Sequence, residues 1–208
     1  RHARRTLRDV MSADAPATLA RKLDLFVQAC RAVAFAHERG VLHTDLKPEN
    51  ILIGARSEVQ VADWGLAIVL GEESQARLQV AGGTPRYMSP EQITELPETL
   101  DARADVWALG VILYELLTDD LPFDGPDDDA VFDAVLEDTL ILPSDRAPAA
   151  GVPGALDQAC ASALSKVRSL RTASVTELLS EVEAYLDDRR EAARLRQIVA
   201  RALEHSQD

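Results

Sequence analysis

The sequence contains little cysteine and no long run of apolar residues. Its two cysteines, Cys30 and Cys160, fall within helical patterns of apolar residues, so they indicate small buried side chains rather than a disulfide framework. The longest apolar stretch, residues 106–117, includes Gly110 and Glu115 and is shorter than the ~18 residues that a membrane span needs. We therefore expect no membrane-spanning segment in these residues.

Positive charge is also scarce. The chain has 22 Lys and Arg against 35 Asp and Glu, a formal net charge of −13, which argues against a nucleic-acid-binding surface. Acidic residues are dense between residues 119 and 138, where no lysine or arginine occurs. A solvated loop is the favoured interpretation of this stretch, and a docking surface for a basic partner or substrate is the alternative.

The chain starts with Arg1, and no secretory signal is visible. We interpret it as a piece of a longer cytoplasmic protein, which could be membrane-anchored outside this segment. With an apolar content of 47%, a chain of 208 residues can bury a real core. A domain of this size buries roughly 70% of its unfolded surface.

Apolar periodicity predicts a mainly helical fold (α+β) with one small β-hairpin. An amphipathic helix is expected over residues 19–39, ending at Gly40, and a helix that is apolar nearly all round is expected over residues 101–117. The alternating residues 51–53 and 59–62 predict two short strands. Toward the C-terminus we expect a short helix, an irregular linker and two further helices, over residues 131–136, 143–153, 156–164 and 175–186.

A cluster of polar residues follows the first of these helices. Asp45 is an acceptor, Lys47 a point charge and Asn50 an amide, and Pro48 between them disfavours helix, so the stretch is expected to be a loop. Asp63 follows after a gap long enough for the two short strands and their turn. Carboxylate and amide oxygens are hard ligands of the kind that Mg²⁺ prefers. The spacing therefore predicts a loop that can meet a phosphate group and a magnesium ion.

Residues 43–50, H-T-D-L-K-P-E-N, resemble the catalytic loop of protein kinases, and residues 63–65, D-W-G, resemble the metal-binding motif that follows it. Residues 82–91 resemble the G-T-x-x-Y-x-x-P-E stretch that ends the activation segment of Ser/Thr kinases. The resemblance implies that residues 1–186 form the large C-terminal lobe of a bacterial eukaryotic-like Ser/Thr protein kinase, with residues 187–208 as a helical extension. Its fold would be a helical bundle with a small β-hairpin that carries the catalytic and metal-binding loops.

The same resemblance implies ATP and Mg²⁺ as cofactors and a protein as substrate. Asp45 would accept the proton of the substrate hydroxyl, and Lys47 would contact ATP and neutralise charge on the transferring phosphoryl group. Asn50 and Asp63 would hold Mg²⁺ against the nucleotide phosphates. Leu52 would form the floor under the adenine ring, a role that is compatible with that of an ordinary core leucine.

Two residues depart from the family pattern. Thr44 replaces the arginine that commonly precedes the catalytic aspartate, which predicts that activity depends little on phosphorylation of the activation segment. Trp64 replaces the phenylalanine of the metal-binding motif and would pack against His43. Thr84, which matches the family threonine, would contact the catalytic Asp and Lys and shape the site for the acceptor hydroxyl.

Three further residues have structural roles in the resemblance. Asp105 would be a buried carboxylate that accepts hydrogen bonds from backbone N–H groups of the catalytic loop. Glu91 would form a buried ion pair with Arg171, and Arg168 is the second candidate for that partner.

Two parts of a complete kinase are missing from these residues. No G-x-G-x-x-G motif occurs before the hinge region, and none of the three lysines lies in a strand of V-A-I-K type. We expect the small N-terminal lobe to be the missing partner of this lobe and the fragment to be catalytically silent. Two other functions are alternatives. A pseudokinase-like binding module is disfavoured by the intact catalytic and metal-binding residues, and a small-molecule phosphotransferase of the aminoglycoside-kinase type would lack the segment at residues 84–91.

The last 22 residues carry an apolar stripe with arginines on other faces. The favoured expectation for residues 187–208 is a helix that packs back on the lobe or leads to a further domain. The alternative is a partner-binding or juxtamembrane helix.

Overall fold

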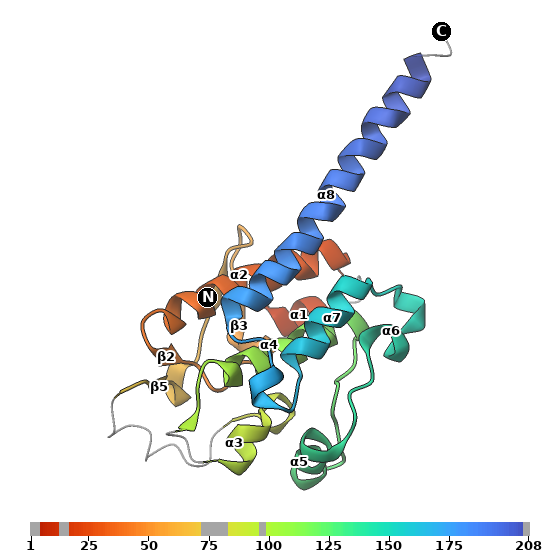
Figure 1. Cartoon of the computed structure of the whole chain (residues 1–208). Helices are drawn as coiled ribbons and strands as arrows, with labels where there is room; N and C mark the ends of the chain where they lie inside the picture. The colour runs from red at the N-terminus through yellow and green to blue at the C-terminus, as the bar shows by residue number, and fades with distance from the viewer. Residues whose placement is uncertain (1–4, 13–16, 72–82, 96–98, 206–208) are drawn as a thin grey trace.

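The computed structural model describes residues 5–12, 17–71, 83–95 and 99–205, which form a mainly helical body from which one helix projects (Figure 1). The helices are α1 (Leu7–Met11), α2 (Leu19–His37), α3 (Pro90–Thr94), α4 (Arg103–Thr118), α5 (Asp128–Glu137), α6 (Pro143–Arg146), α7 (Gly154–Ala163) and α8 (Val175–His205). The strands are β1 (Arg5–Thr6), β2 (Val41–Leu42), β3 (Ile51–Ile53), β4 (Val59–Val61) and β5 (Ile68–Val69). Short 3-10 turns span Pro48–Asn50, Trp64–Leu66, Pro85–Tyr87, Pro148–Ala150 and Arg168–Leu170.

The strands form two small antiparallel sheets. One has the order β1-β3-β4, and the other pairs β2 with β5. In the hairpin β3–β4, Ile51 lies opposite Val61 and Ile53 opposite Val59. The predicted hairpin between the catalytic loop and Asp63 is therefore present, and it returns the chain to the loop that precedes it.

Helix α4 forms the centre of the core, and almost every residue on it is buried. Such a helix needs neighbours on all sides, and α2, α7 and α8 supply them. Gly110 permits the close approach of α7, because a Cβ there would lie 2.9 Å from the Cβ of Ala163 on α7. A side chain at this position would force the two helices apart.

Helix α2 leads directly to the polar loop. Thr18 caps its start by accepting a hydrogen bond from the backbone N–H of Arg21, and one face is buried through Leu23, Phe26 and Val33. Gly40 follows its end with a φ of 72°, a left-handed conformation that glycine adopts without steric cost. The chain then passes through β2 into residues 43–50, so a buried, capped helix fixes the entrance to the loop.

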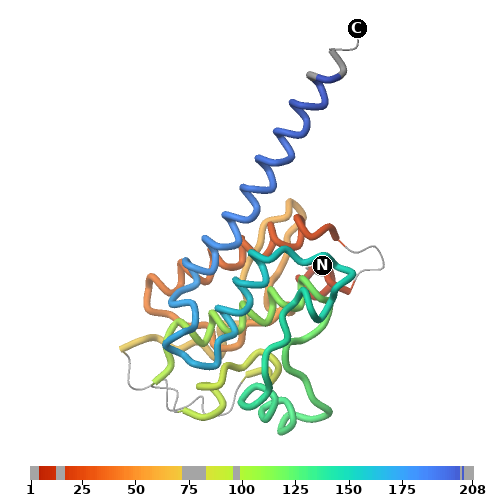
Figure 2. The backbone as a smooth tube through the Cα atoms, turned by 45° about the vertical axis from the view of Figure 1, so that its right-hand side comes forward, coloured from red at the N-terminus to blue at the C-terminus, as the bar shows by residue number. Residues whose placement is uncertain are grey.

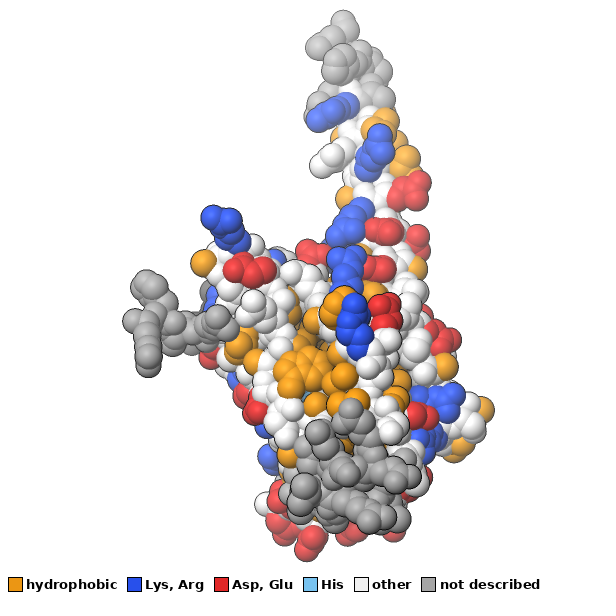
Figure 3. All heavy atoms as spheres, turned by 90° about the vertical axis from the view of Figure 1, so that its left-hand side faces the viewer, with side chains coloured by type: hydrophobic (Ala, Val, Ile, Leu, Met, Phe, Trp, Pro, Cys, Tyr) orange, Lys and Arg blue, Asp and Glu red, His pale blue; other side chains and the backbone are white. Residues whose placement is uncertain are grey.

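Helix α8 continues without a break through the predicted boundary at residue 186. Up to Leu186 it packs on α2, α4 and α7, whereas the side chains of Leu195, Ile198 and Val199 are 56%, 54% and 58% exposed. Figure 2 shows this part extending away from the body, and Figure 3 shows a row of basic side chains along it, all of them arginine in this helix, with Asp and Glu beside them. Arg190 still pairs with Asp24 of α2, but the apolar side chains that follow do not pack back on the lobe in the described residues. The other part of the expectation, that the helix leads to a further domain, and the domain boundary itself stay predictions.

Two other expectations need correction. The linker predicted over residues 143–153 contains α6 and a 3-10 turn, and each of them begins with a proline. Proline is tolerated at the first position of a helix, because a backbone N–H there would make no hydrogen bond within the helix. The short helix predicted over residues 131–136 begins at Asp128, because Asp127 caps it by accepting a hydrogen bond from the N–H of Ala130.

The acidic stretch is not simply a solvated loop, because several of its carboxylates have partners within the chain. Asp119 lies 2.8 Å from Nζ of Lys22, and Asp120 lies 2.6 Å from the guanidinium of Arg146. The pKa of Asp120 is held below its usual value, chiefly by the hydrogen bond from Arg146. Other carboxylates lie in the first turn of α5, where they complement the positive end of the helix dipole.

Within the described ranges, no helix combines the length and the apolar character that crossing a lipid bilayer requires.

Candidate active site

Asp45 lies at the centre of a compact hydrogen-bonded group. Its side chain is 9% exposed. One carboxylate oxygen accepts a hydrogen bond from the hydroxyl of Thr84 at 2.9 Å, and the other lies 3.0 Å from Nζ of Lys47. Lys47 also donates to the Thr84 hydroxyl at 2.7 Å. An acceptor and a cation thus meet at one hydroxyl group, and the contacts expected of Thr84 are present.

Asn50 and His43 hold the backbone of the loop on which Asp45 lies. Nδ2 of Asn50 donates to the carbonyl of Asp45 at 2.9 Å, which turns the amide so that its oxygen is available to a ligand. Nδ1 of His43 accepts from the backbone N–H of Asp45 at 3.3 Å. Because a backbone amide can only donate, the proton of the neutral imidazole lies on Nε2, which donates to the carbonyl of Ala62 at 2.9 Å.

Asp63 directly follows the hairpin and lies in a left-handed conformation with φ 61° and ψ 61°. Aspartate tolerates this region better than most residues. Its carboxylate is exposed, and the following Trp64 packs its ring against His43 with centroids 4.5 Å apart. The expected contact between Trp64 and His43 is therefore present. Leu52 lies in the middle of β3, opposite Thr6, and is partly buried; its role beneath an adenine ring stays a prediction.

The donor set at Asn50 and Asp63 fits Mg²⁺, since both residues offer hard oxygen atoms. Among the described residues, no group of three or more His, Cys, Asp or Glu side chains is placed to hold a metal ion. A magnesium ion at Asn50 and Asp63 would therefore take the rest of its ligands from nucleotide phosphates and water, which is how Mg²⁺ is usually held in phosphoryl-transfer sites.

Asp105, near the start of the core helix α4, fixes the beginning of the catalytic loop. It is 1% exposed and accepts hydrogen bonds from the backbone N–H groups of His43 at 2.8 Å and Thr44 at 2.9 Å. Nε2 of His37, at the end of α2, lies 2.7 Å from the same carboxylate. These partners compensate the burial of the charge, as the sequence analysis expected, and they connect the core helix to the loop.

Glu91 and Arg171 form the predicted buried ion pair. The two side chains are 3% and 0% exposed, and their paired nitrogen–oxygen distances are 2.6 and 2.9 Å. Arg168, the second candidate, instead pairs with Glu95 and Asp101 near the surface. The buried pair ties α3, which ends the segment containing Thr84, to the residues that precede α8.

The arrangement places an acceptor, a cation and two potential metal ligands around a helix-supported loop. In a comparison with known families, the model of the protein kinase domain matches residues 2–187, which include all of these side chains. The chain belongs to the protein kinase family.

Several bacterial serine/threonine-protein kinases are similar to this kinase chain. PknB of Mycolicibacterium smegmatis is 37% identical over 179 residues, which cover 85% of this chain and 28% of that protein. PknB of Mycobacterium tuberculosis is 35% identical with the same coverage. PknD of Protochlamydia amoebophila is 36% identical over 184 residues, which cover 80% of this chain and 18% of that protein. The chain thus spans less than a third of the length of these kinases.

Sequence reasoning did not identify a second network beside the kinase loop. The guanidinium of Arg8 in α1 bonds Glu49 at 2.7 Å and the hydroxyl of Tyr87 at 2.6 Å, and it pairs with Glu115 of α4. Tyr87 donates to Glu115 at 2.7 Å. Burial raises the pKa of Tyr87 well above its usual value, and the charge of Glu115 raises it further. No sequence signal pairs these residues, because they come from four separate segments.

Gln92 was also missed. Its Oε1 accepts from the backbone N–H of Ser89 at 3.0 Å, and its Nε2 donates to the carbonyl of Thr44 at 2.7 Å. The S-x-x-Q spacing of a capping box could have predicted the first contact. The second links α3 to the catalytic loop, and only the folded chain shows it.

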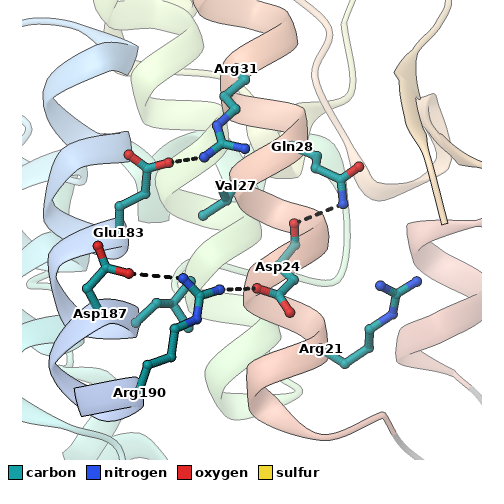
Figure 4. Close-up of a pocket in the computed structure, with 9 residues that line it drawn as sticks. Arg21, Asp24, Val27, Gln28, Arg31, Glu183, Asp187 and Arg190 are labelled. Atoms are coloured by element: carbon teal, nitrogen blue, oxygen red, sulfur yellow. Dashed lines mark hydrogen bonds and ion pairs between the residues drawn. The ribbon is translucent and has the colours of Figure 1, made fainter.

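A cavity of about 500 Å³ lies away from the kinase loop, between α2 and α8 (Figure 4). Its walls carry ion pairs between Arg31 and Glu183 and between Arg190 and both Asp24 and Asp187. No residue of the catalytic loop lines it. The cavity is therefore separate from the hydrogen-bonded group around Asp45.

Proposed function

We propose that the full-length protein to which this chain belongs transfers the γ-phosphoryl group of ATP to serine or threonine hydroxyls of proteins. The observation that carries the proposal is the hydroxyl of Thr84, which donates to Asp45 and accepts from Lys47 at 2.9 and 2.7 Å. A carboxylate that accepts from a hydroxyl while an ammonium group lies beside it is the arrangement that activation of an acceptor hydroxyl requires.

Each residue of the loop has a role in this proposal. Asp45 orients the acceptor hydroxyl and takes its proton, and Lys47 supplies positive charge beside the transferred group. Asn50 and Asp63 hold Mg²⁺, which supplies charge neutralisation to the nucleotide phosphates when it is bound. The similar bacterial proteins are serine/threonine-protein kinases by name, which supports serine or threonine hydroxyls as the class of acceptor.

The proposal includes a partner for this lobe. The 208 residues contain no G-x-G-x-x-G motif and no lysine in a V-A-I-K-type strand. Positioning accounts for most of the catalysis in phosphoryl transfer, so a lobe that neither covers nor anchors the phosphates lacks much of what the reaction needs. We infer that residues outside this sequence form the small lobe that completes the ATP site.

The decisive experiment is Asp45→Asn in the full-length protein, assayed with a generic protein substrate. Loss of the proton acceptor should lower the rate by about 10²–10⁴-fold, the usual contribution of acid–base catalysis. Asp187→Asn is the matched control, because its carboxylate is 72% exposed on α8 and should not affect the rate. Near-wild-type transfer by a folded Asp45→Asn protein would contradict the role assigned to Asp45. Absence of transfer by the wild-type full-length protein would instead favour a binding module without kinase activity.

A further inference from the structure

Thr44 adopts an unusual backbone conformation beside the catalytic aspartate. Its φ is 64°, in the left-handed region that β-branched residues avoid. A residue persists in such a strained conformation only where its surroundings determine it. Thr44 is partly buried, so contacts within the chain must hold it.

Three separate elements hold Thr44. Its backbone N–H donates to Asp105 of α4 at 2.9 Å, and its carbonyl accepts from Nε2 of Gln92 in α3 at 2.7 Å. Its hydroxyl donates to the carbonyl of Leu66 at 2.7 Å. The first two contacts fix the peptide, and the third extends from it to the turn that follows Asp63.

The hydroxyl contact completes a set of links between two short segments. On one side of Asp63, His43 donates to the carbonyl of Ala62; directly after it, Trp64 packs on the His43 ring. The bond from Thr44 to Leu66 then holds the far end of the turn. Residues 43 and 44 thus contact both flanks of the exposed aspartate, and the catalytic Asp45 is the next residue along the chain.

We propose that Thr44 is a positioning residue whose hydroxyl, through the carbonyl of Leu66, sets the place of Asp63 relative to Asp45. This inference rests on the proposed kinase function. The bond joins a neutral donor to a neutral acceptor, so it needs no charged group in the activation segment. A residue without a hydroxyl would leave the Leu66 carbonyl without this donor and release one flank of the turn.

Hydrogen exchange on the 208-residue chain tests the link without any assay of activity. In Thr44→Val, which keeps the size and branching of the side chain, amides of residues 67–70 should exchange about three- to tenfold faster, the change that an ordinary hydrogen bond gives. Thr44→Ser should restore wild-type exchange. Thr94→Val is the matched control, because its exposed hydroxyl donates to a carbonyl within α3. Equal exchange in Thr44→Val and wild type would overturn the proposal.

Kinetics of the full-length protein test the consequence for the metal-binding aspartate. Thr44→Val should raise the Mg²⁺ concentration for half-maximal activity and lower kcat by about three- to tenfold, as expected for one lost hydrogen bond. Thr44→Ser should stay near wild type, and so should the control at Thr94. An equal loss in the serine and valine variants would show that the hydroxyl is not responsible.

Gln92→Glu keeps the proposal testable if Thr44→Val does not fold. Glutamate preserves the capping box with Ser89, but its carboxylate cannot donate to the Thr44 carbonyl. The same shift in Mg²⁺ requirement is expected, and its absence would count against the proposal. If the wild-type protein shows no transfer at all, the proposed function fails, whereas the exchange experiment still decides whether Thr44 holds the turn.

Discussion

Glu91→Ala should destabilise this chain strongly, because it leaves the guanidinium of Arg171 buried and without a counter-ion. The Arg171 side chain is 0% exposed, and the partners that remain to it among the described residues are neutral: the carbonyls of Ser165 and Arg103, both at 2.9 Å, and the ring of Trp107, whose centroid lies 5.0 Å away. Removing one member of a buried pair costs about 3–5 kcal/mol. In a chain of this size each kcal/mol lowers the melting temperature by about 2–4 °C, so a fall of about 6–20 °C is expected.

Thermal melting followed by circular dichroism measures this effect, with Glu95→Ala as the matched control. Glu95 directly follows α3 and pairs with Arg168 at 3.2 Å, but the two side chains are 39% and 26% exposed. Such a surface pair contributes about 0–1 kcal/mol. If Glu91→Ala melts within a few degrees of the control, the argument from burial is wrong, even though the nitrogen–oxygen distances of the Glu91–Arg171 pair are short.

Three further predictions concern the activation segment, alkaline stability and the isolated lobe. Ser74 is the only hydroxyl between residues 66 and 83 and lies outside the described residues; Ser74→Ala in the full-length protein should change the rate only a few-fold, since Thr44 offers no cation to a phosphate, and a large loss restored by Ser74→Glu would refute this. Above pH ~10 an unfolded tyrosine ionises, whereas burial and Glu115 raise the pKa of Tyr87 in the folded chain, so the free energy of unfolding should fall as pH rises past ~10. Tyr87→Phe should weaken this dependence of the free energy of unfolding on pH, measured by urea titration at several pH values, and an unchanged dependence would contradict the prediction. Burial also raises the pKa of Tyr114, to about 12, so Tyr114 contributes to the pH dependence equally in both proteins. The 208 residues alone should show no detectable ATP binding by calorimetry with Mg²⁺ present, and measurable transfer of labelled phosphate by them would overturn the need for a second lobe.

The sequence by itself determined the elements whose causes are local. The catalytic loop, the hairpin and the D-W-G turn are nearly contiguous, so turn residues and alternation suffice to place them. The all-round apolar pattern of residues 106–117 likewise predicted a buried helix, and the structure buries it. The continuation of α8 past residue 186 was also within reach, because residues 175–208 contain neither glycine nor proline and are rich in Ala, Leu, Glu and Arg.

Only the tertiary structure decided which distant side chains meet. Arg168 and Arg171 both lie in the region where a partner for Glu91 was expected, but the folded chain buries only Arg171 and leaves Arg168 partly exposed near the surface. The left-handed Thr44 contradicts its own local preference, because its hydrogen bonds with α3, α4 and the turn after Asp63 together outweigh the strain. Such contacts depend on which polar groups are buried together when remote segments of the chain pack. Local sequence does not predict these pairings, and only the folded structure shows them.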